Sequence, residues 1–200
     1  MCEFILERRR EVAAYVKVLA IGIAILAIEL FGAWLSGSLA LASDAGHVFT
    51  DLMVVGTGIV IAMGELRALT ARPRLRLVGV WIHALLLGGV ALSIVAEAIY
   101  RIEEPTKISP LPLFVAALVG LFGNFLQYSV SRTVKNRTQR GIHVHIASDF
   151  ACSLAVVISA LLIFITGRHE VDTIVSFVIA GAILAFGLPA FVPGEDHRHE

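Results

Sequence analysis

The segment LALASDAGHVFTDLMVVGTGIVIAM, residues 39–63, is apolar and long enough to cross a membrane, yet it carries three ionisable side chains. Asp44, His47 and Asp51 fall within about two turns of a single helix. One charged side chain at the centre of a bilayer costs roughly 3 kcal/mol on insertion scales. The segment therefore predicts a membrane protein, and it predicts a partner that offsets the cost of these charges.

Five further apolar stretches approach or exceed the roughly 20 residues that span a hydrocarbon core. They cover residues 12–35, 77–100, 111–131, 142–165 and 171–192. Helices are required, because lipid cannot satisfy exposed backbone groups and no barrel-type alternation is present. We expect an all-α polytopic membrane protein, a six-transmembrane-helix bundle over residues 12–192. Residues 1–11 are expected to form a cytoplasmic N-terminal segment, and residues 193–200 a short cytoplasmic tail.

The composition supports this class. Hydrophobic residues make up 58% of the 200-residue chain and charged residues only 16%, whereas soluble domains average about 25% charged residues. The formal net charge is zero, so no global electrostatic argument favours nucleic acid as a partner. Cys2 and Cys152 lie far apart and do not indicate a disulfide framework. The N-terminus shows no small-residue cleavage site, so we expect no removable signal peptide.

Lysine and arginine in the short loops predict the orientation. Twelve of them fall on one side of the membrane and three on the other, with Lys17 left out because it lies within the first span. The poorer side holds only Arg101, Lys107 and Arg168. We therefore expect both termini to face the cytoplasm.

Two matching motifs carry the chemistry. His47 and Asp51 stand four residues apart in the second span, and His145 and Asp149 repeat the spacing in the fifth. Side chains four residues apart share one face of a helix. Two imidazoles and two carboxylates from facing helices can form a tetrahedral site, which suits zinc. The alternative is that the two pairs form interhelical hydrogen bonds or an ion pair.

The chain resembles the cation diffusion facilitators, membrane exporters of zinc and related divalent ions. The resemblance rests on the paired His-x-x-x-Asp motifs and on five longer stretches. These are ELFGAWLSGSLALASDAGHVFTDL (29–52), AEAIYRIEEP (96–105), GLFGNFLQYSV (120–130), HVHIASDFACSLAVVIS (143–159) and VDTIVSFVIAGAIL (171–184).

This resemblance implies a transport site at His47, Asp51, His145 and Asp149. Histidine in the first of these places is similar to the zinc-type members. It also implies a homodimer, in the bacterial inner membrane, that resembles the shorter members without a cytoplasmic C-terminal domain. The loop RALTARPR (67–74) has no histidine, so a metal site that some relatives hold there is not expected.

The predicted activity is export of a divalent metal cation, most simply zinc, by alternating access with proton antiport. Metal binding requires neutral imidazole and ionised carboxylate, so protons and metal compete for the same side chains. The metal is a transported substrate, and no cofactor is expected. Manganese, iron, cobalt or cadmium is the main alternative. A non-transporting sensor or an intramembrane metallohydrolase is weaker, because no HExxH motif and no general base are found. The chain is thus predicted not to be an enzyme.

Other polar residues have two interpretations each. For Asp44 we favour a position at the water interface, with cation attraction as the alternative. Glu29 and Asn124 either hydrogen-bond the ligands or join helices. Asp172 suits the start of its own helix. His83 is expected to be an ordinary bundle histidine. His143 is expected to be interfacial, with delivery of metal from the cytoplasm as the alternative. His197 and His199 belong to a tail that we expect to be disordered, with weak metal capture as the alternative.

One geometric conflict arises from these boundaries. The ligands of the second span lie deeper from its outer end than those of the fifth span lie from its inner end. The levels differ by several Å at about 1.5 Å per residue. Tilt or displacement of one helix would resolve the conflict, but we favour an earlier start of the fifth helix within residues 135–141, with Asn136 near its N-cap.

Overall fold

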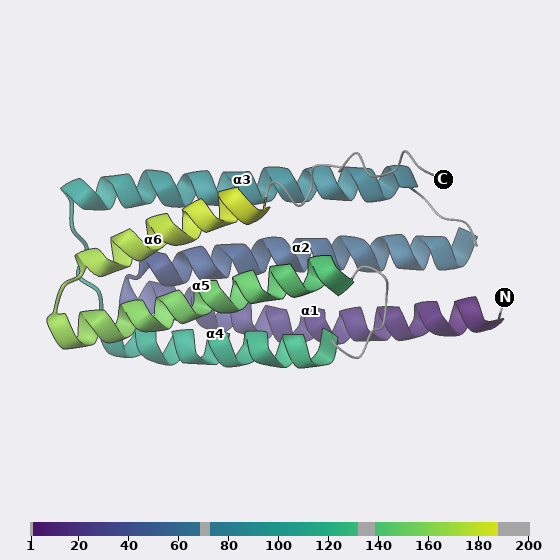
Figure 1. Ribbon diagram of the computed structural model, residues 1–200, viewed down its shortest axis with the longest axis horizontal. Coiled ribbons are helices and arrows are strands. Elements are labelled where there is room, and N and C mark those ends of the chain that lie inside the picture. The colour runs from purple at the N-terminus through teal and green to yellow at the C-terminus, as the bar shows by residue number, and fades with distance from the viewer. Residues whose placement is uncertain (1, 69–72, 132–138, 188–200) are drawn as a thin grey trace.

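The computed structural model describes residues 2–68, 73–131 and 139–187, and throughout these ranges the chain is helical or in short connections. The helices are α1 (Cys2–Ser36), α2 (Leu39–Ala68), α3 (Pro73–Glu103), α4 (Pro110–Ser131), α5 (Gln139–Thr166) and α6 (Glu170–Ala182). A π-helical turn, η1 (Ile183–Gly187), extends α6. The helices lie side by side along one long axis (Figure 1). The predicted all-α polytopic bundle is confirmed.

Five helices are long and apolar enough to cross a membrane, among the residues described: α1 to α5 each contain such a segment. The sixth predicted span corresponds to α6 with η1, and its last residues, 188–192, lie outside the described part. The helix boundaries extend beyond the predicted apolar stretches, since α1 already begins at Cys2 and α3 at Pro73. Proline at a first helical position needs no backbone N–H partner. Hydropathy marks only the part of each helix that fits in lipid.

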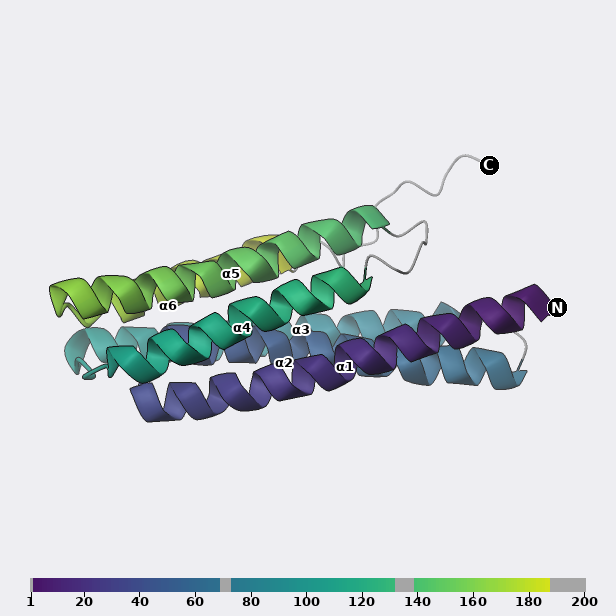
Figure 2. The ribbon, with the colours of Figure 1, turned by 90° about the horizontal axis from the view of Figure 1, so that it is seen from below.

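Helices α1 and α2 form a tight antiparallel hairpin. Gly37 supplies the positive φ of 72° that reverses the chain between them, as the SGS sequence predicts. Contacts between the two helices continue away from that turn in a constant register. Gly32 lies against Leu41, Ile25 packs with Val48 and Leu52, and Gly22 lies against Leu52. Figure 2 shows α1 running diagonally in front of α2, with α4 drawn above it.

Small residues allow α1 to approach α4 closely. A methyl group at Gly32 would overlap Ala116, one at Gly120 would overlap Glu29, and one at Gly123 would overlap Ile25. Such stripes of small residues let membrane helices gain van der Waals contact between backbones, in the absence of a hydrophobic driving force. This seam fixes the depth of α1 against α4.

Asp172 closes the bundle at the end where α1 turns into α2. Its buried carboxylate accepts hydrogen bonds from the backbone N–H groups of Leu39 (2.7 Å) and Ala40 (3.4 Å), and from the Ser38 hydroxyl. It therefore caps the N-terminus of α2 from another helix. Arg101 donates to the Gly37 carbonyl (2.7 Å) and lies 3.9 Å from Asp172. The interpretation of Asp172 as a residue that serves its own helix start was incomplete, because that reading considers one helix alone.

The conflict of levels between α2 and α5 is resolved in two ways. Helix α5 begins at Gln139, within the predicted interval, so the earlier start is confirmed. Its far end also extends beyond the α1–α2 turn (Figure 1), so α5 is displaced along the bundle axis as well. Asn136, the predicted cap, lies outside the described residues.

The α1–α4 seam gives a first prediction. Gly32→Ala should lower the stability of the protein in detergent by about 1–3 kcal/mol, because the added methyl group meets Ala116, which has no flexible end to move. The matched control is Gly89→Ala in α3, where an added Cβ meets nothing within 4 Å and helix propensity favours alanine by about 1 kcal/mol. Thermal unfolding measures both. Equal melting temperatures for the two variants would contradict the close α1–α4 contact.

Candidate metal centre

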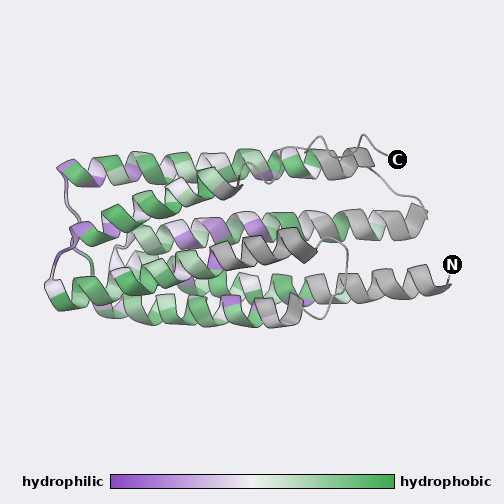
Figure 3. Ribbon diagram, in the orientation of Figure 1, coloured by the Kyte–Doolittle hydropathy of each residue, from purple (hydrophilic) through white to green (hydrophobic). Residues whose placement is uncertain are grey.

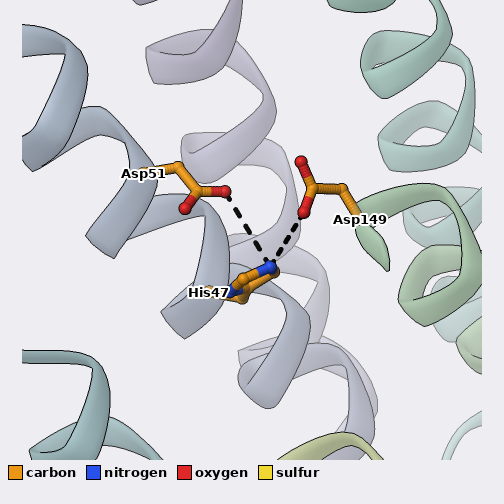
Figure 4. A group of neighbouring side chains, drawn as sticks. All are labelled: His47, Asp51 and Asp149. Carbon is orange, nitrogen blue, oxygen red and sulfur yellow. Dashed lines mark hydrogen bonds and ion pairs between the residues drawn. The ribbon is translucent and has the colours of Figure 1, made fainter. Parts of the chain in front are cut away.

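The candidate centre lies between the first half of α2 and the first half of α5. His47 and Asp51 are one turn apart on α2, as their spacing requires, and Asp149 faces them from α5 (Figure 4). The Thr50 hydroxyl donates to the His47 carbonyl (2.8 Å), so this buried hydroxyl finds its partner within α2. Figure 3 shows that hydrophilic positions interrupt the otherwise apolar α2 in the half of the helix nearer to the α1–α2 turn.

The three side chains converge on one point. Nε2 of His47 lies 2.9 Å from Oδ1 of Asp149 and 3.9 Å from Oδ2 of Asp51. One ligand atom from each of the three residues lies within 4.8 Å of the others. Ligand atoms that share a tetrahedral zinc ion at about 2.0–2.1 Å are about 3.4 Å apart. This value lies between the 2.9 Å and 3.9 Å that separate Nε2 of His47 from the two carboxylates. A zinc ion bound to all three side chains would require the two carboxylates to adjust around it, since the present separations fall on both sides of that value.

The fourth predicted ligand, His145, lies in α5 one turn before Asp149. The side chains of residues 139–148 lie outside the described part of the structure. The position of the His145 imidazole relative to the other three side chains is therefore not described. Three of the four predicted site residues are thus brought together from two helices that are distant in sequence, and the fourth stays a prediction.

Burial is uneven across the centre. The Asp51 and Asp149 side chains keep 20% and 18% of their accessible surface, whereas that of His47 keeps 5%. Asp44, one turn nearer the α1–α2 turn, is only 1% exposed. The centre is therefore more tightly enclosed at Asp44, on the side of the α1–α2 turn, than at Asp51 and Asp149.

A second link between α2 and α5 runs beside the first. The Ser153 hydroxyl donates to Asp44 (2.7 Å), and the Asn124 amide of α4 donates to Ser153 (2.8 Å). Placing Asp44 at the water interface was wrong, since the side chain is buried and faces α5. Sequence reasoning missed Ser153, although its position one turn after Asp149 could have marked it as a candidate partner.

The remaining polar residues divide between the two interpretations. Asn124 joins α4 to α5, because its side-chain amide donates to the Ser153 hydroxyl. Glu29 is fully buried in α1. His83 is buried in α3, as expected for a bundle histidine. The side chain of His143, and all of His197 and His199, lie outside the described part of the chain.

Comparison with known proteins gives the family. The model of the cation efflux transmembrane domain matches residues 16–194. The chain is 30% identical over 168 residues to the zinc transporter ZitB of Yersinia pestis, covering 78% of this chain and 53% of that protein. It is 29% identical over 169 residues to the cadmium, cobalt and zinc/H(+)-K(+) antiporter of Bacillus subtilis (80% and 54%).

A third relative is the metal cation efflux system protein CzcD of Cupriavidus metallidurans, 31% identical over 161 residues, with 77% of this chain and 51% of that protein covered. The chain spans about half the length of these curated relatives. The family match extends from residue 16, within α1, through the rest of the described bundle and includes both ligand-bearing helices. The chain is therefore an integral membrane protein of the cation efflux family, the cation diffusion facilitators.

Proposed function

We propose that this protein exports a divalent metal cation, zinc in the first place, across the bacterial inner membrane in exchange for protons. The observation that carries the proposal is the convergence of His47, Asp51 and Asp149 from two helices inside a membrane bundle. A divalent ion would offset the cost of holding two partly buried carboxylates within a membrane bundle. Imidazole together with carboxylate suits zinc better than it suits hard cations such as magnesium and calcium, which prefer oxygen ligands alone.

His145 completes the proposed site. Its spacing to Asp149 equals that of His47 to Asp51, which favours a fourth donor from α5. Four protein ligands would enclose the ion, so the site lacks the open position at which catalytic zinc holds a water. That ligand number supports transport over hydrolysis. The names of the relatives mention cadmium and cobalt as well as zinc, so cadmium and cobalt are alternative substrates in this proposal.

Proton exchange follows from the ligands. As the pH falls, imidazole and carboxylate gain protons and lose metal, so the affinity for metal decreases with decreasing pH. If the bundle alternates between two access states, metal released outside is replaced by protons that leave at the more alkaline cytoplasmic side. The same four side chains then bind both substrates, and each excludes the other.

The orientation is also part of the proposal. The end of the bundle at which α1 begins carries the arginines at 8–10, 67, 74 and 76, and the other end carries only Arg101, Lys107 and Arg168. The positive-inside rule places the arginine-rich end in the cytoplasm, with both termini. Because the centre is more tightly enclosed toward the opposite end, this conformation supports metal entry from the cytoplasm. A homodimer is proposed on the resemblance to the family alone.

The ligand assignment predicts the binding behaviour of three variants. His47→Ala and His145→Ala should each weaken zinc binding more than about 100-fold. That value is the upper end of the loss expected when a residue that only hydrogen-bonds to a metal ligand is removed. His83→Ala, which removes a buried histidine from α3, should leave the affinity within about threefold. Isothermal calorimetry on the purified full chain measures all three. Full affinity in His145→Ala would remove α5's histidine from the site, and full affinity in His47→Ala would contradict the site itself.

Exchange with protons predicts a response to an imposed gradient. In proteoliposomes with an acidic lumen, external zinc should enter faster than in vesicles without a pH difference, because protons leaving down their gradient drive zinc inward. A protonophore that collapses the gradient should remove the acceleration. Zinc-sensitive dye in the lumen reports the uptake. Zinc uptake that ignores the gradient would refute proton antiport and leave the metal site untouched.

A further inference from the structure

A second acidic pair lies next to the candidate metal centre, on the side of the α1–α2 turn. The register of the hairpin, in which Gly32 meets Leu41 and Ile25 meets Val48, brings Glu29 of α1 level with Asp44 of α2. Glu29 is 0% and Asp44 1% exposed. With Asn124 of α4 and Ser153 of α5, they form a buried polar layer to which four helices contribute one side chain each.

The hydrogen bonds within this layer are incomplete. Asp44 accepts one, from Ser153, through Oδ2. Within the described part of the chain, three carboxylate oxygens lack a hydrogen-bond partner: both oxygens of Glu29 and Oδ1 of Asp44. An isolated carboxylate without partners is very costly in an apolar interior, and such a group takes up a proton instead. Two neighbouring carboxyl groups that cannot both ionise bind a proton for the same reason.

The layer is closely packed on the side of α4. The Glu29 carboxylate packs directly on the backbone of α4 at Gly120, where even one added methyl group would overlap it. Gly120 is thus the position that admits the glutamate side chain between α1 and α4. A proton adds almost no volume, and protonation would remove the cost of a buried carboxylate charge that lacks hydrogen-bond partners.

We propose that Glu29 and Asp44 form a proton-binding pair, separate from the metal centre, that exchanges its proton against the metal. The coupling is electrostatic. A divalent cation at His47, Asp51 and Asp149 lies one turn from Asp44 and repels the proton of the pair, and by linkage the bound proton weakens metal binding equally. The pair would thus add a proton to those displaced from the ligands themselves. This coupling rests on the proposed function, whereas the protonated pair does not.

Few titratable groups surround the pair. Helix α2 contributes His47 and Asp51, and α5 contributes Asp149 and Cys152; the described side chains of α4 that reach this region are uncharged. Among the described side chains, no lysine or arginine is paired with Glu29 or Asp44. The metal ion is therefore the one strong positive charge that the proposal places near the pair.

The test counts protons released when zinc binds. The full chain in detergent, weakly buffered, is titrated with zinc while a pH indicator records release. Glu29→Gln keeps the shape of the side chain and should bind zinc within about threefold of wild type, but release up to about one proton fewer per zinc. Glu104→Gln, at an exposed carboxylate in the loop after α3, is the matched control and should behave as wild type.

Unchanged proton release in Glu29→Gln would overturn the proposal. A loss of zinc affinity of tenfold or more would overturn it as well, since the glutamate would then belong to the metal centre. If Glu29→Gln does not fold, Asp44→Asn supplies the same readout.

Infrared spectroscopy tests the pair without any metal. The carbonyl stretch of a protonated carboxylic acid should be present in metal-free wild type and lose intensity in Glu29→Gln or Asp44→Asn, but not in Glu104→Gln. A wild-type spectrum without this band would refute the protonated pair. If wild type binds no zinc, the proposed function fails, and the infrared result still decides whether the pair carries a proton.

Discussion

The contact between His47 of α2 and Asp149 of α5 is the interaction on which the site depends. It spans 2.9 Å between two helices that are separated by about a hundred residues of chain. Inside a bilayer, ionisable groups are retained only where something offsets their desolvation. The rest of the bundle can be understood as a scaffold that holds these two side chains, and Asp51, at one level within an apolar surrounding.

Several features of the fold serve this alignment. The α1–α2 turn, capped from α6 by Asp172 and braced by Arg101, sets where α2 begins and hence the depth of His47. The Ser153–Asp44 hydrogen bond fixes the register of α2 against α5 one turn away from the site. Both devices lie on the side of the α1–α2 turn. The constraints on the ligands are thus strongest toward one end of the bundle, and the exposed surface of Asp51 and Asp149 lies beyond them.

Much of this could be predicted from sequence because lipid limits the choices. Apolar length and the requirement for internal hydrogen bonds predict the helices, and the SGS turn predicts the first hairpin. The four-residue spacing of His47 and Asp51 predicts a shared face. What joins one helix to another was not accessible in the same way. Asp44 and Asp172 were assigned to helix ends because their partners, Ser153 and the start of α2, lie more than a hundred residues away. No local pattern encodes such pairings.

The location of a bound ion tests the central assignment most directly. Crystals of the full chain grown with zinc and measured at the zinc absorption edge should show an anomalous peak about 2.0–2.2 Å from Nε2 of His47 and from carboxylate oxygens of Asp51 and Asp149. Helix α5 should supply the fourth donor through His145. A zinc peak that contacts only one of the two helices, or that lies away from both in zinc-saturated protein, would contradict a shared intramembrane site.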